Sequence, residues 1–174
     1  MSDLDKIVAI FPVVFMLHDF EEIIGFESWL KNNREELARR FPRIEKRFDK
    51  GGMFLLSTST FAFAVCVVFV LVSLMSFISL YLGIYQWWFV VFSAFFVHLF
   101  IHIGQWIVYG KYIPAIITSF LSLPYCFYAF YVLFEYSDFS VAEMLFWMFL
   151  GTILMLIIVP CVLNLAGRLQ KTLS

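Results

Sequence analysis

Three ionisable residues, His18, Glu21 and Glu22, stand in a stretch of the N-terminal region that is otherwise mostly apolar. Their spacing of three and four positions places the three side chains on one face of a helix. An acidic side chain at the centre of a membrane-spanning helix costs roughly 2.5 to 3.5 kcal/mol, so such residues usually face a bundle interior and serve a function. We therefore expect a functional site on this face.

A second polar stripe follows later in the chain, where His98, His102 and Gln105 recur at helical spacing. Imidazole and carboxylate groups bind zinc and iron, and carboxylate-bridged di-metal bundles use Glu/His pairs one helical turn apart. The two stripes together predict one or two divalent ions, zinc or iron, held by His18, Glu21, Glu22, His98 and His102. One of the two glutamates is expected to be the general base and the other a ligand; we favour Glu22 as the base, and Glu21 stays the alternative.

Other residues are weaker candidates for this site. Asp19 points about 100° away from His18 on the helix, so we expect it to be a surface or outer group. Residues that could line the site are Gln105, Tyr112, Thr118 and Asn164. A hydroxyl bonded to its own backbone is the ordinary explanation for Thr118.

The composition determines the class of protein. The chain is 63% hydrophobic, 21% aromatic and 14% charged, with a mean hydropathy of +0.91, whereas soluble domains are about one quarter charged. We expect an all-α integral membrane bundle forming a single domain over residues 1–174. Cys66, Cys126 and Cys161 lie in apolar runs without paired spacing, which argues against a disulfide framework. No basic patch suggests a nucleic-acid partner.

Five apolar runs are long enough to cross a bilayer, which takes about 20 helical residues. The predicted spans are about 7–26, 53–82, 87–109, 113–134 and 141–166. Residues 27–52 form a basic loop that is expected to be helical and to lie on the membrane surface. A break between two short helices is expected at Phe41-Pro42, because proline disfavours a helical residue before it.

Charge predicts the orientation in the cytoplasmic membrane. The loop carries eight basic residues, and Lys111, Arg168 and Lys171 mark the same side, while Glu135, Asp138 and Glu143 mark the other. The positive-inside rule then places the loop and the C-terminus in the cytoplasm and the N-terminus outside. Spans one and three both run inward, so both stripes reach one depth: His18 and His98 near mid-membrane and the remaining groups about 6 Å further in.

Three blocks of the sequence resemble the HXXEE family of small membrane proteins. They are His18-Asp19-Phe20-Glu21-Glu22, then His98-Leu-Phe-Ile-His102 with Gly104-Gln105, and finally Lys111-Tyr112-Ile113-Pro114 with Thr118. The resemblance covers roughly residues 10–122 and implies a membrane-embedded, metal-using enzyme. Where the family often has glycine after the proline, this chain has Ala115, which bears only on the local backbone.

The leading hypothesis is a metal-dependent enzyme acting on a lipid or another amphiphile, as a hydrolase or an oxidase. Three alternatives stay open: a metal-free acid/base isomerase, a small proton- or metal-coupled transporter, and a non-catalytic membrane partner subunit. Against transport, the polar groups cluster at one depth and no inverted repeat is evident. Whether the bundle forms a homodimer is also open.

Overall fold

Several helices of the computed structural model begin or end at residues that commonly cap helices. The structure describes residues 1–136 and 139–173, and the described part is helical without a strand. Its elements are α1 (Asp3–Arg40), α2 (Pro42–Gly51), a 3-10 turn η1 (Met53–Leu55), α3 (Thr58–Leu82), α4 (Tyr85–Tyr109), α5 (Ile116–Tyr136) and α6 (Val141–Leu173). Ser2 and Ser57 accept hydrogen bonds from the first turns of α1 and α3, and glycines in the left-handed conformation follow α2, α3 and α4.

Four helices are long and apolar enough to cross a membrane: α3, α4, residues 116–135 of α5 and residues 141–168 of α6. The all-helical membrane bundle is therefore confirmed. Among the described residues α1 does not qualify by composition, since its apolar run is interrupted by His18, Asp19 and two glutamates. The first of the five spans stays a prediction. Asp138 and the side chain of Lys171, both used for the topology, lie outside the described part.

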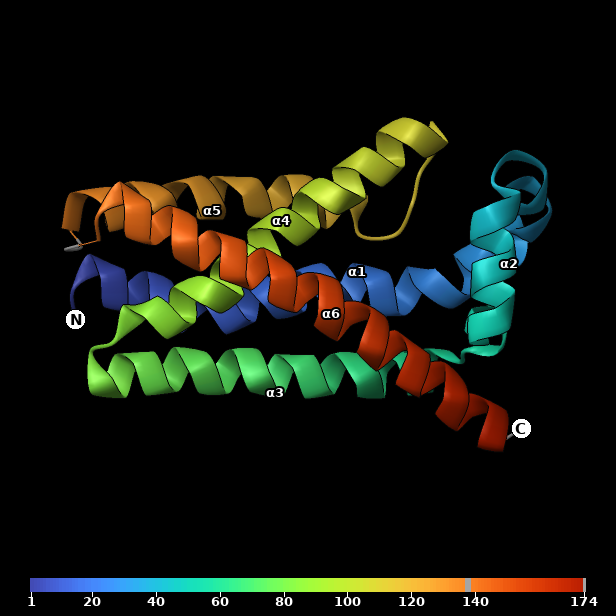
Figure 1. Cartoon of the computed structure of the whole chain (residues 1–174), viewed down its shortest axis with the longest axis horizontal. Helices are drawn as coiled ribbons and strands as arrows, with labels where there is room; N and C mark the ends of the chain where they lie inside the picture. Colours follow the sequence, from blue (N-terminus) through green and yellow to red (C-terminus); the bar gives the residue numbers. More distant parts are fainter. Residues whose placement is uncertain (137–138, 174) are drawn as a thin grey trace.

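Helix α1 occupies the middle of the bundle, although it is the least apolar of the long helices. Figure 1 shows it running between α3 on one side and α5 on the other, and it packs against both. It is one continuous helix to Arg40, so the expected first short helix of the basic loop is the end of α1. The expected break follows directly, with α2 starting at Pro42.

Helices α4 and α6 cross each other obliquely (Figure 1), and small residues let them approach. Gly151 of α6 lies at the crossing, where a Cβ atom would overlap the hydroxyl of Ser93 and the carbonyl oxygen of Val90. This contact holds α6 against the helix that carries His98 and His102.

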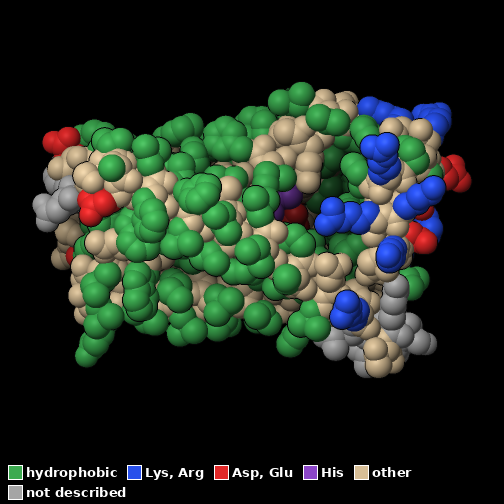
Figure 2. Space-filling model, viewed as in Figure 1, with side chains coloured by type: hydrophobic (Ala, Val, Ile, Leu, Met, Phe, Trp, Pro, Cys, Tyr) green, Lys and Arg blue, Asp and Glu red, His purple; other side chains and the backbone are tan. Residues whose placement is uncertain are grey.

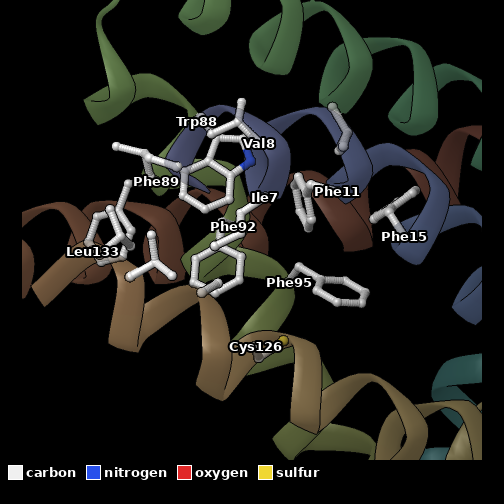
Figure 3. Close-up of a cluster of buried hydrophobic side chains, with 14 of the residues drawn as sticks. Ile7, Val8, Phe11, Phe15, Trp88, Phe89, Phe92, Phe95, Cys126 and Leu133 are labelled. Carbon is white, nitrogen blue, oxygen red and sulfur yellow. The ribbon is translucent and has the colours of Figure 1, made fainter. Parts of the chain in front are cut away.

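Aromatic side chains fill the end of the bundle nearest the N-terminus. Figure 3 shows Phe11 beside Trp88, Phe92 and Phe95, and its ring centroid lies 5.6 to 5.9 Å from theirs in edge-on contacts. Such pairs each add about 0.5–1.5 kcal/mol beyond the area they bury. This core fixes the relative positions of α1 and α4 over the two to three turns that precede their histidines.

The opposite end of the bundle, here called the basic end, carries α2. Figure 1 shows α2 lying across this end, roughly at right angles to α3, and Figure 2 shows Lys and Arg side chains gathered there. Helix α2 buries none of its side chains fully. A short amphipathic helix across the end of an apolar bundle is typical of a segment in the membrane interface.

Candidate metal centre

The three histidines of the chain meet between α1 and α4. One ring nitrogen from each of His18, His98 and His102 lies within 4.8 Å of the others. The two Nε2 atoms of His98 and His102 are 2.9 Å apart, and the His18 ring centroid lies 5.5 and 5.3 Å from theirs. Nitrogen ligands about 2.1 Å from a tetrahedral ion are roughly 3.4 Å from one another. The cluster therefore has the dimensions of a metal site.

Two carboxylates adjoin the histidines. Glu22 Oε1 lies 3.3 Å from His102 Nε2, and Asp19, Glu22 and His98 form a second group whose ligand atoms are also within 4.8 Å of one another. His98 belongs to both groups, so the arrangement offers room for one ion or for two neighbouring ions. Asp19 is only 5% exposed. It was expected to be an outer group, and the cost of burying an acid in a membrane bundle was the signal that could have drawn attention to it.

His18 has one nitrogen with a partner and one without. Its Nδ1 lies 3.2 Å from the Thr118 hydroxyl, whereas its Nε2 is buried without a hydrogen-bond partner. Buried polar atoms are normally paired, so an orphaned ring nitrogen beside two other imidazoles points to a ligand. His102 Nδ1 is a second unpaired buried nitrogen.

Glu21 faces a different neighbour from Glu22. Its carboxylate accepts hydrogen bonds from the Thr118 backbone N–H at 2.8 Å, the Thr118 hydroxyl at 2.7 Å and the Tyr112 hydroxyl at 2.9 Å. Thr118 lies in the first turn of α5, whose free N–H groups favour a carboxylate. Glu21 thus joins α1 to α5 and belongs to neither group of potential ligands.

The Thr118 hydroxyl connects Glu21 to the histidine cluster. Because its proton is directed to the carboxylate, the oxygen can only accept from His18, so Nδ1 of His18 carries the ring proton. Nε2 then has a free lone pair. Metal-binding histidines commonly donate their other N–H to an oxygen acceptor, which fixes the tautomer and the ring orientation. The expected lining role of Thr118 is thereby given a specific geometry.

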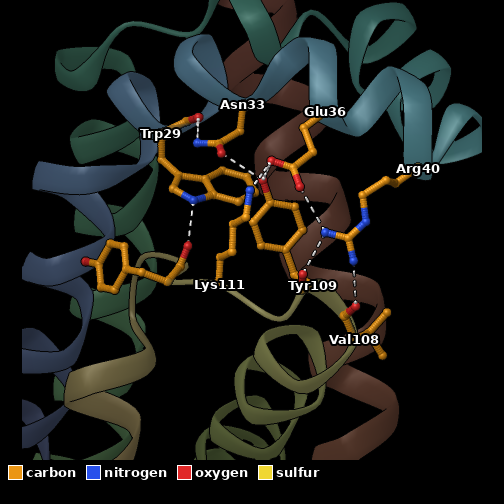
Figure 4. A network of polar contacts seen from close by, with 8 residues as sticks. Trp29, Asn33, Glu36, Arg40, Val108, Tyr109 and Lys111 are labelled. Atoms are coloured by element: carbon orange, nitrogen blue, oxygen red, sulfur yellow. Dashed lines mark hydrogen bonds and ion pairs between the residues drawn. The ribbon is translucent and has the colours of Figure 1, made fainter.

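A polar network holds the loop that carries Tyr112 and leads to Thr118. Figure 4 shows Glu36 of α1 between Arg40 and Lys111; its carboxylate lies 3.0 and 2.8 Å from their nitrogens. These two cations lower the pKa of Glu36 to about 2, with the Lys111 hydrogen bond as the largest cause. In the same network the Trp29 indole N–H donates to the Tyr112 carbonyl oxygen at 2.9 Å. The extension of α1 beyond the bundle therefore positions the start of α5.

The backbone of this loop bends at Ala115, which has a φ of 73° and is fully buried. Only glycine adopts that left-handed conformation without steric cost. The glycine that the resemblance leads one to expect here thus corresponds to a real requirement of the backbone. The bend turns the chain after Pro114 so that the N–H of Thr118 faces Glu21.

Two cavities meet at the cluster. The larger, of about 530 Å³, lies toward the basic end between α1, α2, α4 and α6, and the smaller, of about 190 Å³, lies among α1, α3, α4 and α6. Glu22 and His98 line both. Figure 2 shows a hollow in the apolar surface with His and acidic side chains visible inside it. The cluster is therefore accessible from the side of the bundle.

The remaining lining candidates are separated by the structure. Gln105 lines the larger cavity next to His102. Tyr112 is about half exposed and serves Glu21. Asn164 lies beside Gly51, at the end of α2, and lines neither cavity.

Comparison with known proteins identifies a family without an assigned activity. Residues 9–129, more than half of the chain, match the model of a family described as "Protein of unknown function with HXXEE motif". No curated protein matches the chain, and no solved structure does. The match contains both histidine stripes and the loop that leads to Thr118.

Proposed function

We propose that this chain, which belongs to the HXXEE family, holds a divalent metal ion between α1 and α4 and uses it to transform a lipid or another amphiphile. The observation that carries the proposal is that one ring nitrogen from each of three buried or half-buried imidazoles lies within 4.8 Å of the others, while His18 Nε2 has no hydrogen-bond partner. Three histidines with an adjoining carboxylate are a donor set that zinc and iron accept.

The charge of the site supports a cation. Asp19 and Glu22 lie close together, and among the described residues His102 is the only basic side chain within ion-pair distance of either. Two carboxylates in a bilayer-buried site need either protonation or a cation to offset the loss of hydration. A divalent ion next to three neutral imidazoles removes that cost.

The residues of the site divide the work between binding and proton transfer. His18, His98 and His102 would bind the metal, which supplies Lewis acidity and activates water when bound. Glu22, at 3.3 Å from His102 Nε2 and open to both cavities, is placed to accept a proton from water or substrate. Glu21 orients His18 through Thr118 in place of the ligand role first assigned to it. Zinc would favour hydrolysis, and two irons would favour oxidation.

The orientation follows from the charges and is part of the proposal. With the basic end in the cytoplasm, α1 crosses the membrane inside the bundle, and the N-terminus lies outside. His102 and His98 are seven and eleven residues from the end of α4 at Tyr109, or about 10 and 16 Å along the helix. The site would thus lie within the cytoplasmic leaflet of the inner membrane.

Elemental analysis of protein purified without chelators tests the proposal. The wild type should contain zinc or iron, and His98→Ala and His102→Ala should lower both the metal content and the melting temperature, because a ligand stabilises only the folded form it binds. Ile107→Ala, on the same helix but exposed and outside both ligand groups and both cavities, is the control. Glu22→Gln should retain metal while slowing turnover of extracted membrane lipids about a hundredfold or more. Metal-free wild type with unaffected histidine variants would instead support acid/base catalysis or transport.

A further inference from the structure

The two flanks of α2 differ in how their charges are paired. On one flank Glu45 and Asp49 form ion pairs with Arg34 of α1, at 3.3 and 2.7 Å. On the other flank Arg43 and Arg47, one helical turn apart, are exposed and have no carboxylate partner in the described part of the chain. This leaves a pair of adjacent guanidinium groups on the side of α2 away from Arg34.

Arg43 and Arg47 flank the apolar residues through which α2 lines the larger cavity. Ile44 and Phe48 line that cavity. At 100° per residue, Arg47 is about 60° and Arg43 about 100° from Ile44, on the same flank. Figure 2 shows Lys and Arg side chains bordering the hollow on its α2 side. An occupant of the cavity that reaches this edge therefore meets cationic groups.

The walls of the two cavities suit a chain-like apolar molecule. Beyond the cluster, the smaller cavity is lined by hydrocarbon and aromatic side chains such as Val72, Val90 and Phe95. The larger cavity has a similar lining, with polar groups chiefly at Glu22, His98, His102 and Gln105. A molecule lying through both cavities would present an apolar chain to the walls and one section of itself to the cluster.

We propose that the substrate is a lipid of the cytoplasmic leaflet whose anionic headgroup, a phosphate or a carboxylate, is bound by Arg43 and Arg47. This rests on the proposed function for the chemistry at the cluster. Guanidinium groups bind such oxyanions through two parallel hydrogen bonds. Since the histidines lie about 10 to 16 Å below the end of α4, the section in contact with the cluster is the linkage region or the first part of the acyl chain, and the headgroup stays at the mouth.

Lipid binding to the purified protein tests the headgroup site without requiring turnover. Native mass spectrometry in detergent would compare phosphatidylglycerol with phosphatidylcholine. The wild type should prefer phosphatidylglycerol, and Arg43→Gln/Arg47→Gln should weaken that binding more than tenfold, because each basic residue near an anionic lipid contributes about 1 kcal/mol. Lys46→Gln removes one charge about 160° from Ile44, on the back of α2, and should change binding less than threefold. A loss in Lys46→Gln equal to that in Arg43→Gln or Arg47→Gln alone would overturn the proposal.

A cavity-filling variant tests whether the chain enters the bundle. Gly104 lines the larger cavity, and a Cβ atom there would meet nothing within 4 Å. Gly104→Phe should fold like the wild type and lose phosphatidylglycerol binding, whereas Gly104→Ala should retain it. Wild-type binding by a folded Gly104→Phe would refute entry into the cavity. Lipid binding by His98→Ala separates the two proposals. If neither the wild type nor His98→Ala contains metal but both bind phosphatidylglycerol, the lipid site is supported and only the metal centre is contradicted.

Discussion

Replacing Thr118 by valine is the most direct test of how the site is oriented. Valine keeps the shape of the side chain and removes only the hydroxyl, which donates to Glu21 at 2.7 Å and lies 3.2 Å from His18 Nδ1. Glu21 keeps three donors, the backbone N–H groups of Ile117 and Thr118 and the Tyr112 hydroxyl. His18 is fully buried, so its Nδ1 has no water to replace the lost partner.

The size of the effect follows from these contacts. Losing a hydrogen bond to a charged group costs about 1.5–3 kcal/mol, and leaving a buried ring N–H unpaired costs about 1–3 kcal/mol. The two contributions overlap because they share one oxygen, so we expect Thr118→Val to lower the free energy of unfolding by about 2–4 kcal/mol. The loss of an outer hydrogen bond to a metal-binding histidine typically weakens metal affinity 10- to 100-fold.

Two measurements check the expected losses of metal affinity and of stability. Zinc affinity is measured by competition with a chromophoric chelator, and stability by thermal unfolding in detergent with and without zinc. Thr118→Ser is the control, because it keeps the hydroxyl and loses one methyl group, worth about 0.8 kcal/mol. If Thr118→Val binds zinc as tightly as Thr118→Ser does, the hydroxyl does not orient His18, and the connection from Glu21 to the metal centre is refuted.

Three further predictions concern the loop, its polar network and the topology. In Ala115→Gly, relief of the left-handed backbone strain and loss of a buried methyl group nearly cancel, so the free energy of unfolding should change by less than about 1 kcal/mol. Ala115→Val should lower it by more than about 2 kcal/mol, and thermal unfolding measures both. Because the pKa of Glu36 is lowered to about 2, its contribution to the stability of the fold is present above its ordinary pKa of 4.5 and is lost as the pH falls toward 2. Glu36→Gln should therefore flatten the plot of melting temperature against pH between these values, and an unchanged slope would contradict the network. In a cysteine-free background, an impermeant thiol reagent should label cysteines at Asn32 and Ser140 from opposite sides of the membrane; labelling from one side would contradict the orientation.

Much of the fold and the meeting of the two stripes could be predicted because both depend on regular properties of helices. Hydropathy identifies the apolar helices, and a spacing of four positions puts His98 and His102 on one face. The depth argument then brings His18 to the same level as His98. In the structure the ring nitrogens of these three side chains lie within 4.8 Å of one another.

The roles of the acidic residues could not be predicted, since neighbouring positions on a helix face different partners. Asp19, Glu21 and Glu22 point in directions that differ by up to about 160°. Glu21 meets the N-terminus of α5, and Glu22 and Asp19 meet His98. Packing across the whole bundle determines which helix lies on which side of α1. The sequence of the motif alone does not contain that information.

The adjacent glutamates, Glu21 and Glu22, therefore have different roles in the same turn of α1. The carboxylate of Glu21 accepts from four donors of the Tyr112–Thr118 segment, so its partial burial is compensated within the protein. Glu22 is 17% exposed and contacts a histidine that is neutral unless protonated, so its negative charge is left for a ligand to neutralise. One glutamate fixes the geometry of the imidazole cluster, and the other keeps the site attractive to a cation or to a proton. This division gives a physical reason for two consecutive acids one helical turn after a histidine.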